Sequence, residues 1–303
     1  MGTGGAAYGS DRKAGKPVLK TQRVREILMK LLFLLCACVS VAAVIMICMF
    51  MFANGVPAIA EIGVFKFLGG MQWKPSQGLF GIFPMIIGSI YVTAGAVIIG
   101  VPTGILTAVF LVKYCPDKLY KVIKPAVELL AGIPKIVYGF FGLVVIVPVI
   151  QSIAGTSGKG VLTASILLGI MILPTVISTT EASLRAVPDS YYEGSLALGA
   201  TKERSIFRAM FPAARSGILS GVILGVGRAI GETMAVVMVA GNQSILPDSI
   251  LDGVRTLTAN IVLEMAYAEG LHRKALIGTA VVLFVFILII NLCFSAIKRG
   301  GKK

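Results

Sequence analysis

Six long apolar runs divide the chain, with polar connections between them. Each run is close to the roughly 20 residues that a helix needs to cross the ~30 Å hydrocarbon layer of a bilayer. The pattern predicts an all-α polytopic membrane protein with six transmembrane helices in a domain covering residues 31–297. The runs cover residues 31–53, 85–112, 136–154, 160–180, 216–240 and 275–297, between tails at 1–30 and 298–303.

The second run extends beyond what one straight crossing requires. Residues 79–112 contain no charged side chain, and a helix of that length would extend about 51 Å. Two crossings and a turn would need more residues. Because proline disrupts a helix interior, Pro84 and Pro102 predict a short helix followed by one kinked span.

Composition agrees with a membrane protein and excludes several other classes. The chain is 56% hydrophobic and 14% charged, whereas soluble domains carry about 25% charged residues. A soluble enzyme, a disordered chain and a disulfide-rich secreted domain are therefore excluded. The five cysteines are odd in number and lack metal-site spacing, so we expect no metal site. The first run is also too long for a cleaved signal peptide, which predicts an uncleaved anchor.

Basic residues are distributed unevenly between the two sides that this topology defines. Of the 28 Lys and Arg, 21 lie in the tails and in the connections at 113–135, with Lys135 included, and at 181–215. Because cytoplasmic loops carry the excess of Lys and Arg, we expect both termini in the cytoplasm. We attribute the net charge of +14 to this bias, and not to nucleic-acid binding. On the outer side, we expect Trp73 to be an interfacial anchor.

Two charged residues interrupt the fifth run. Arg228 and Glu232 are four residues apart, so a continuous helix would place them on one face. An arginine at mid-membrane depth costs about 2.5–3.5 kcal/mol on insertion scales, so this face should meet protein or a pore. Two interpretations stay open: an internal salt bridge that fixes packing, or an anion site in which Glu232 holds the guanidinium when the site is empty. We favour the anion site because intramembrane charges mark transport paths.

The longest polar insert, residues 181–215, is rich in charge and in helix formers. Its glycine at position 199 predicts two short helices with a break between them, although an ordinary charged loop remains an alternative. Elsewhere, the P-loop pattern around Lys159 is incomplete. His272 is the only histidine, which suffices for neither a metal site nor a catalytic triad. We therefore expect no catalytic residue and interpret His272 as structural.

Several motifs resemble those of ABC importer permeases. Glu193, Gly199 and Pro212 match the EAA loop of that family, although Gly194 and Ser195 replace its two alanines. The segments at 128–140 and 228–233, the latter reading R-A-I-G-E-T, resemble phosphate-importer permeases, and the following residues resemble their C-type (PstC-like) subunits. The resemblance covers about residues 65–291.

The resemblance implies a type I ABC importer permease (MetI-like) fold with cytoplasmic coupling helices, in the plasma or inner membrane. It implies that Glu193, Gly199 and Pro212 couple to an ATPase, and that Arg228 and Glu232 act in phosphate translocation. This chain would bind no cofactor, because ATP and Mg would be bound by partner subunits. The implied partners are a homologous A-type permease (PstA-like), two cytoplasmic ATPase subunits (PstB-like) and an extracytoplasmic phosphate-binding protein (PstS-like), besides inorganic phosphate and membrane lipid.

Two alternatives remain for the function. A permease for another oxyanion, sulfate or molybdate, would share the EAA loop but is expected to lack R-A-I-G-E-T. An ion-coupled secondary carrier would need no ATPase-docking loop and would be expected to contain inverted repeats, which the sequence does not display.

Overall fold

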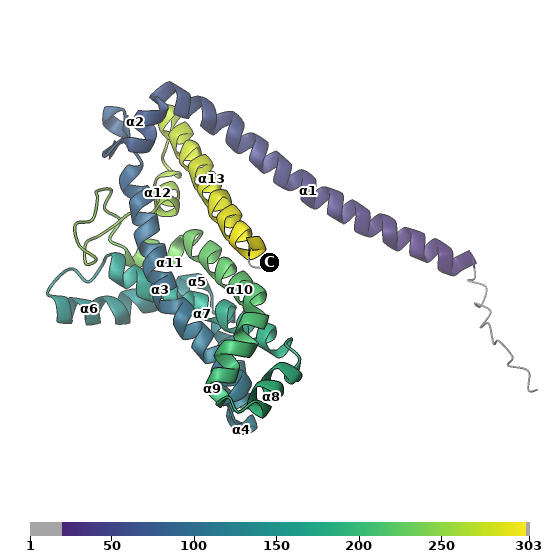
Figure 1. The fold of residues 1–303 in the computed structure, drawn as a ribbon. Helices are drawn as coiled ribbons and strands as arrows, with labels where there is room; N and C mark the ends of the chain where they lie inside the picture. Colours follow the sequence, from purple (N-terminus) through teal and green to yellow (C-terminus); the bar gives the residue numbers. More distant parts are fainter. Residues whose placement is uncertain (1–19, 301–303) are drawn as a thin grey trace, which may run out of the picture. The chain divides into compact units, whose positions relative to one another are not determined.

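The computed structural model describes residues 20–300, and their side chains from 25 to 296. It divides into two units, residues 1–50 and 51–303. Helix α1 (Lys20–Ile62) runs through both (Figure 1). Within unit 1, α1 leaves its apolar side chains exposed, as suits a helix surrounded by lipid or by another apolar chain. The predicted tails lie largely outside the described residues.

Among the described residues, six helical segments are long and apolar enough to cross a membrane. The predicted all-α class with six spanning helices is confirmed. The segments are Arg25–Ile62, Phe83–Lys113, Lys135–Ala154, Val161–Arg185, Lys202–Ile230 and Gly270–Ala296.

The second span differs from the prediction at its start. Residues 79–82 do not form a leading helix: a short antiparallel hairpin, β1 (Trp73–Lys74) and β2 (Leu79–Phe80), encloses the 3-10 turn η1 (Pro75–Gln77). A single helix, α3 (Phe83–Lys113), follows, with Pro84 in its first turn. Proline is tolerated there because the first N–H groups of a helix have no intrahelical partner.

Helix α7 (Val161–Arg185) forms the centre of unit 2. It packs against α3 on one side and α10 (Phe211–Ile230) on another. Glycines permit the close approach: a Cβ on Gly100 of α3 would clash with Ile172, and one on Gly221 of α10 would clash with Thr179. Without a hydrophobic effect between helices inside a bilayer, such small-residue contacts are a principal source of packing.

The third span is segmented. Helix α4 (Asp117–Gly132) precedes a break at Ile133–Pro134, after which come α5 (Lys135–Phe141), the π-helical turn η2 (Gly142–Ile146) and α6 (Val147–Ala154). Proline disfavours helical backbone in the residue before it, which explains the break. The span at Lys135–Ala154 thus starts a new helix at Lys135.

The fifth span is also segmented, and the predicted continuous helix over 216–240 is wrong. Helix α10 ends at Ile230, and a short helix, α11 (Met234–Val239), begins after the non-helical residues 231–233. Gly231 favours the break because glycine loses more conformational entropy in a helix than other residues do. Thr258 stabilises it, because its hydroxyl donates to the Glu232 carbonyl over 3.0 Å.

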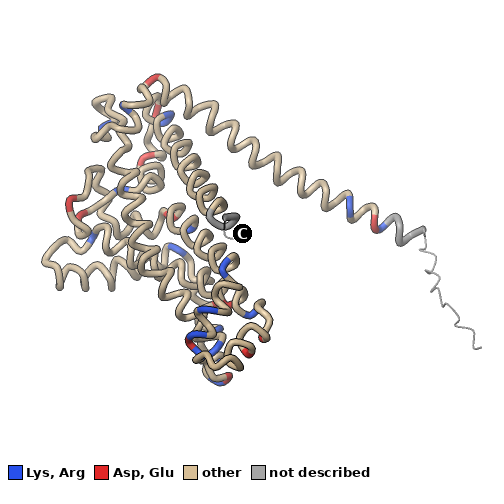
Figure 2. The backbone as a smooth tube through the Cα atoms, viewed as in Figure 1, with Lys and Arg blue, Asp and Glu red and all other residues tan. Residues whose placement is uncertain are grey.

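The remaining elements lie mainly at the two ends of unit 2. One end, here called the basic end, contains α4, α8 (Asp189–Ala197) and α9 (Lys202–Ser205), and charged residues gather there (Figures 1 and 2). The opposite end contains α2 (Val64–Gly69), the hairpin and the start of α13 (Gly270–Gly300). Two further elements complete the chain: the π-helical turn η3 (Ile206–Met210) and α12 (Leu257–Glu264).

Candidate functional site

Arg228 lies in the last turn of α10, facing α7. The two helices run antiparallel, with Gly217 opposite Ser183 and Gly225 opposite Val176. This register brings Arg228 to Thr175, whose Oγ1 accepts a hydrogen bond of 3.1 Å from Nη1. Thr175 lies ten residues before Arg185, the end of α7, which corresponds to about 15 Å of helix. Arg228 is therefore well inside the membrane-spanning bundle, as the sequence predicts.

Glu232 does not share a helix face with Arg228, and this prediction is wrong. The helix ends between the two residues, and no ion pair joins them among the described side chains. Glu232 is 2% exposed and lies 2.9 Å, Oε2 to Nζ, from Lys135. That contact is an ion pair without hydrogen-bond geometry, while Oε1 accepts a long hydrogen bond of 3.4 Å from the N–H of Ala235. The internal salt bridge with Arg228, one of the two interpretations left open by the sequence, is absent among the described side chains, and Glu232 pairs with Lys135 instead.

The packing of α5 against α11 explains why Lys135 reaches Glu232. A Cβ on Gly139 would lie 3.0 Å from the Cα of Ala235, and one on Gly142 would lie 2.9 Å from Val239. The two helices therefore run parallel and nearly in contact. Lys135 precedes Gly139 by four residues and Glu232 precedes Ala235 by three, about one helical turn in each case. The Gly139–Ala235 contact therefore places Lys135 level with Glu232.

Lys135 consequently lies deep in the bundle, and its assignment to a cytoplasmic connection is wrong. Glu232 follows Arg228 by four residues toward the opposite end, and Lys135 lies beside it. Sequence reasoning missed Lys135 because it treated 113–135 as one connection. The available signal was Pro134, which predicts a new helix beginning at Lys135.

Tyr138 fixes the start of α5 to the end of α4. It is buried one turn after Lys135, and its hydroxyl donates to the carbonyl of Leu130 over 2.7 Å. Lys135 at this start lies beside the carboxylate of Glu232, which follows Arg228 by four residues.

The residues predicted to couple to an ATPase lie at the basic end. Glu193 is exposed on α8, and Pro212 lies in the first turn of α10. Gly199 lies between α8 and α9 with φ of +83°, a conformation that side chains disfavour. The two short helices with a glycine break are therefore present. Leu198 beside the glycine is 91% exposed, so the tip of this insert presents an apolar side chain outward.

Polar contacts hold this insert to the end of α3 and to itself. Lys113 lies 3.5 Å from Asp189 and over the ring of Tyr192, while the Ser195 and Ser205 hydroxyls are 3.0 Å apart. A cluster of buried apolar side chains lies beneath: Val109, Leu184, Val187, Ile206, Met210, Ala214 and Ile218. The insert is thus an ordered part of the bundle.

A buried carboxylate also ties α4 to the end of α7. Glu181 accepts hydrogen bonds from the Tyr120 hydroxyl at 2.7 Å, from Lys124 at 2.9 Å and from Arg185 at 3.0 Å. The hydrogen bond to Glu181, followed by burial, raises the pKa of Tyr120 above its ordinary value. Both oxygens of the Glu181 carboxylate accept hydrogen bonds, which is typical of a structural contact.

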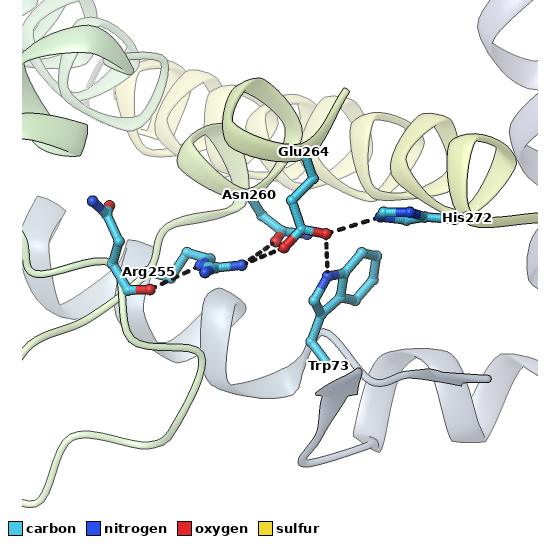
Figure 3. A network of polar contacts seen from close by, with 6 residues as sticks. Trp73, Arg255, Asn260, Glu264 and His272 are labelled. Carbon is cyan, nitrogen blue, oxygen red and sulfur yellow. Dashed lines mark hydrogen bonds and ion pairs between the residues drawn. The ribbon is translucent and has the colours of Figure 1, made fainter. Parts of the chain in front are cut away.

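A second carboxylate with several partners, Glu264, lies near the opposite end (Figure 3). Its carboxylate accepts from Trp73 Nε1 at 2.7 Å and from Arg255 Nη1 at 2.7 Å, and it lies 2.8 Å from His272 Nε2. Arg255 also donates to Asn260 and to the carbonyl of Asn242. Trp73 is buried, so the expectation of an interfacial anchor is wrong: its indole binds Glu264. His272 lies in this network, where its ring joins α13 to the end of α12.

No group of three or more candidate metal ligands occurs among the described residues. Within the same part of the chain, all five cysteines are free thiols. The deep site presents the cations Arg228 and Lys135, the carboxylate of Glu232 and the hydroxyl of Thr175.

Six spans among the described residues, with α3 and α10 packed on α7 and two short helices leading into the fifth span, define the fold of a type I ABC importer permease. Two solved transporters share this fold. The MetNI methionine ABC transporter in an inward-facing conformation has a TM-score of 0.60 at 19% identity, covering 77% of this chain and 100% of that chain. A bacterial ABC transporter involved in alginate import has a TM-score of 0.58 at 14% identity, covering 93% and 100%.

Residues 100–300 match the family model of the binding-protein-dependent transport system inner membrane component, and the chain belongs to this family. A probable ABC transporter permease protein of Bacillus subtilis, YqgH, is 36% identical over 92% of this chain and 94% of its own length. The phosphate transport system permease protein PstC of Mesorhizobium japonicum is 36% identical over 79% and 80%. That of Pasteurella multocida is 32% identical over 79% and 81%. The chain is thus a PstC-like permease.

Proposed function

We propose that this chain is the C-type permease subunit of an ATP-driven phosphate importer. The observation that carries the proposal is Arg228, held at mid-span depth with only Thr175 as its hydrogen-bond partner among the described side chains. A guanidinium suits an oxyanion because its planar fork donates paired hydrogen bonds. The relatives named as phosphate permeases support phosphate as that oxyanion.

The partners follow from the class of transporter. A homologous permease would complete the path, a phosphate-binding protein would deliver the anion at the opposite end, and two ATPase subunits would dock at the basic end, facing the cytoplasm. The insert with Glu193, Gly199 and Pro212 would receive the ATPase, supported by its ordered packing and by the outward Leu198. ATP and Mg would be bound by those subunits, so this chain would have no catalytic residue.

Reconstitution tests the proposal most directly. The chain is purified with its partner permease and ATPase subunits, placed in liposomes and supplied with the phosphate-loaded binding protein. We expect uptake of labelled phosphate that requires ATP and is not reduced by unlabelled sulfate or molybdate. Uptake of those oxyanions in preference to phosphate would contradict the substrate. Phosphate uptake without ATP hydrolysis would contradict the transport class and favour a secondary carrier.

The docking insert has its own test. Gly199→Asp and Gly199→Ala both place a side chain at the same positive φ, and an added Cβ meets no atom of this chain within 4 Å. Both variants therefore share the backbone strain, of about 1–2 kcal/mol, and differ in the charge presented outward. We expect Gly199→Asp to abolish uptake or uncouple ATP hydrolysis, and Gly199→Ala to retain much of both. Equal activities of the two variants would count against docking at this glycine.

A further inference from the structure

Lys135, the first residue of the third span, lies level with the buried Glu232 and faces outward from the chain. Its side chain is 52% exposed, and its neighbours on α5 are apolar and open, with Ile136 and Phe140 each 60% exposed. An ammonium in contact with lipid tails at this depth would cost several kcal/mol by insertion scales. The exposed side of Lys135 must therefore meet water or another polypeptide.

The carboxylate that pairs with Lys135 is poorly satisfied. Glu232 Oε2 has the ammonium at 2.9 Å but no hydrogen bond among the described residues, and Oε1 has one at 3.4 Å. Glu181, by contrast, accepts three short hydrogen bonds. Lys135 can therefore leave Glu232 without breaking a well-formed hydrogen-bond network, and its exposed side offers a direction in which to move.

The other cation of the site, Arg228, precedes Glu232, the partner of Lys135, by four residues. An ammonium adds a compact point charge, and a guanidinium adds a directional fork. Together they suit a small oxyanion such as phosphate, which has several acceptor oxygens.

We propose that Lys135 is a second cation of the anion path, which leaves Glu232 to bind the transported oxyanion and returns to it when the anion moves on. This inference rests on the proposed function. Each departure of Lys135 leaves a buried carboxylate without its counter-charge, which opposes tight anion binding. Such opposition is useful, because conduction requires a site that also releases its ion.

The test separates attraction of the anion from a purely structural ion pair. Four variants are expressed with the partner subunits: Lys135→Gln, Lys135→Arg, Glu232→Gln, and the double variant Lys135→Gln with Glu232→Gln. Complex yield and phosphate uptake per assembled complex are measured for each. We expect Lys135→Gln to lower uptake about tenfold or more, since a charge lining a path raises the local anion concentration by at least that factor. Lys135→Arg should retain uptake, because it keeps the charge.

The double variant is decisive. It removes both charges, so a structural ion pair predicts that complex yield and uptake both recover. A cation of the anion path predicts that the yield recovers while uptake per complex stays about tenfold low. Normal uptake by the double variant would overturn the inference.

Chemical restoration of the charge provides a second measurement. Lys135→Cys with Glu232→Gln is purified in the complex and treated with 2-bromoethylamine, which converts an accessible cysteine into a close analogue of lysine. Wild-type complex treated in parallel controls for the five native cysteines. We expect uptake to rise after treatment even though Glu232 is absent, and no rise would overturn the inference.

A failure of the proposed function would look different. If the wild-type complex imports sulfate or molybdate and not phosphate, the phosphate assignment is wrong, and the same variants then report on Lys135 with that anion. If the wild type imports phosphate and the double variant does too, only the role of Lys135 is wrong.

Discussion

Two carboxylates of this chain are almost equally buried and have opposite surroundings. Glu264 is 7% exposed and has an indole N–H, a guanidinium and an imidazole within 2.8 Å of its oxygens. Glu232 is 2% exposed and has one ammonium and one long backbone hydrogen bond. Burial alone therefore does not separate a structural carboxylate from one that takes part in transport.

The two sites differ in the number of hydrogen bonds that a rearrangement would break. A carboxylate that accepts several short hydrogen bonds is fixed in one arrangement, because moving it leaves buried polar groups unsatisfied. A site with spare donors and acceptors can accept a ligand without that penalty. We therefore expect substitutions around Glu264 to act on stability and those around Glu232 to act on transport.

The largest effect on stability is expected for Glu264→Gln. The change retains the shape of the side chain and removes the charge opposite Arg255. Removing one partner of a buried ion pair commonly costs about 3–5 kcal/mol, so the thermal midpoint and the yield of the purified complex should fall strongly. Uptake per assembled complex should be close to normal. Glu269→Gln, at an exposed position in the same region, is the control and should be stable. Wild-type stability of Glu264→Gln would show that the network is not structural.

Trp73→Phe should give the next largest loss of stability. Phenylalanine fills most of the pocket but lacks the N–H that donates to Glu264. A hydrogen bond to a charged group is worth about 1.5–3 kcal/mol, less than the loss of the charge itself. Thermal unfolding of the complex measures this, with Tyr267→Phe at an exposed aromatic position as control. A loss of stability larger than that of Glu264→Gln would show that the Glu264 carboxylate is not the centre of this network.

The sequence predicts the spans well because long apolar runs determine them with little help from tertiary structure. It predicts the two short helices before the fifth span for a similar reason, since Gly199 is a local signal with a local consequence. Arg228 is also found from the sequence, because a charge inside an apolar run has few interpretations.

The errors occur where tertiary contacts decide between local alternatives. The helical pattern continues through Gly231, and a contact from Thr258, distant in sequence, stabilises the break. Lys135 was placed in a connection because α4 carries lysines along its length, although the packing of α5 on α11 brings it level with Glu232. Trp73 was assigned to the interface because its partner, Glu264, is 191 residues away.

Arg228→Gln should affect stability less than either change near Glu264 and should affect uptake more. Stability should change by about 1.5 kcal/mol, the low end of the range for a hydrogen bond to a charged group, because the bond to Thr175 is only partly buried. Uptake per assembled complex should fall about tenfold or more, because the path loses a cation. Arg228→Lys should be intermediate, since it keeps the charge but lacks the fork.

Arg215→Gln, at an exposed position of the same helix, is the control. Because Glu232 pairs with Lys135, adding Glu232→Gln to Arg228→Gln should not restore uptake; full restoration would favour a packing role.

The smallest effect is expected for Thr175→Val, which removes the hydroxyl that accepts from Arg228 and leaves the shape of the side chain nearly unchanged. Stability should fall by about 1.5 kcal/mol, the low end of the range for a hydrogen bond to a charged group, because this bond is only partly buried. The guanidinium would lose its only described hydrogen-bond partner and sample more orientations, so uptake should fall severalfold without loss of complex. Thr103→Val is a matched control, because the hydroxyl of Thr103 binds only carbonyls of its own helix, Ile99 at 2.7 Å and Gly100 at 3.2 Å. Measurement of both variants at equal complex yield isolates the orientation of Arg228. If Thr175→Val and Thr103→Val transport equally well, contacts other than Thr175 hold the guanidinium of Arg228 in place. The deep site would then resemble the site at Glu264, where several contacts hold one side chain.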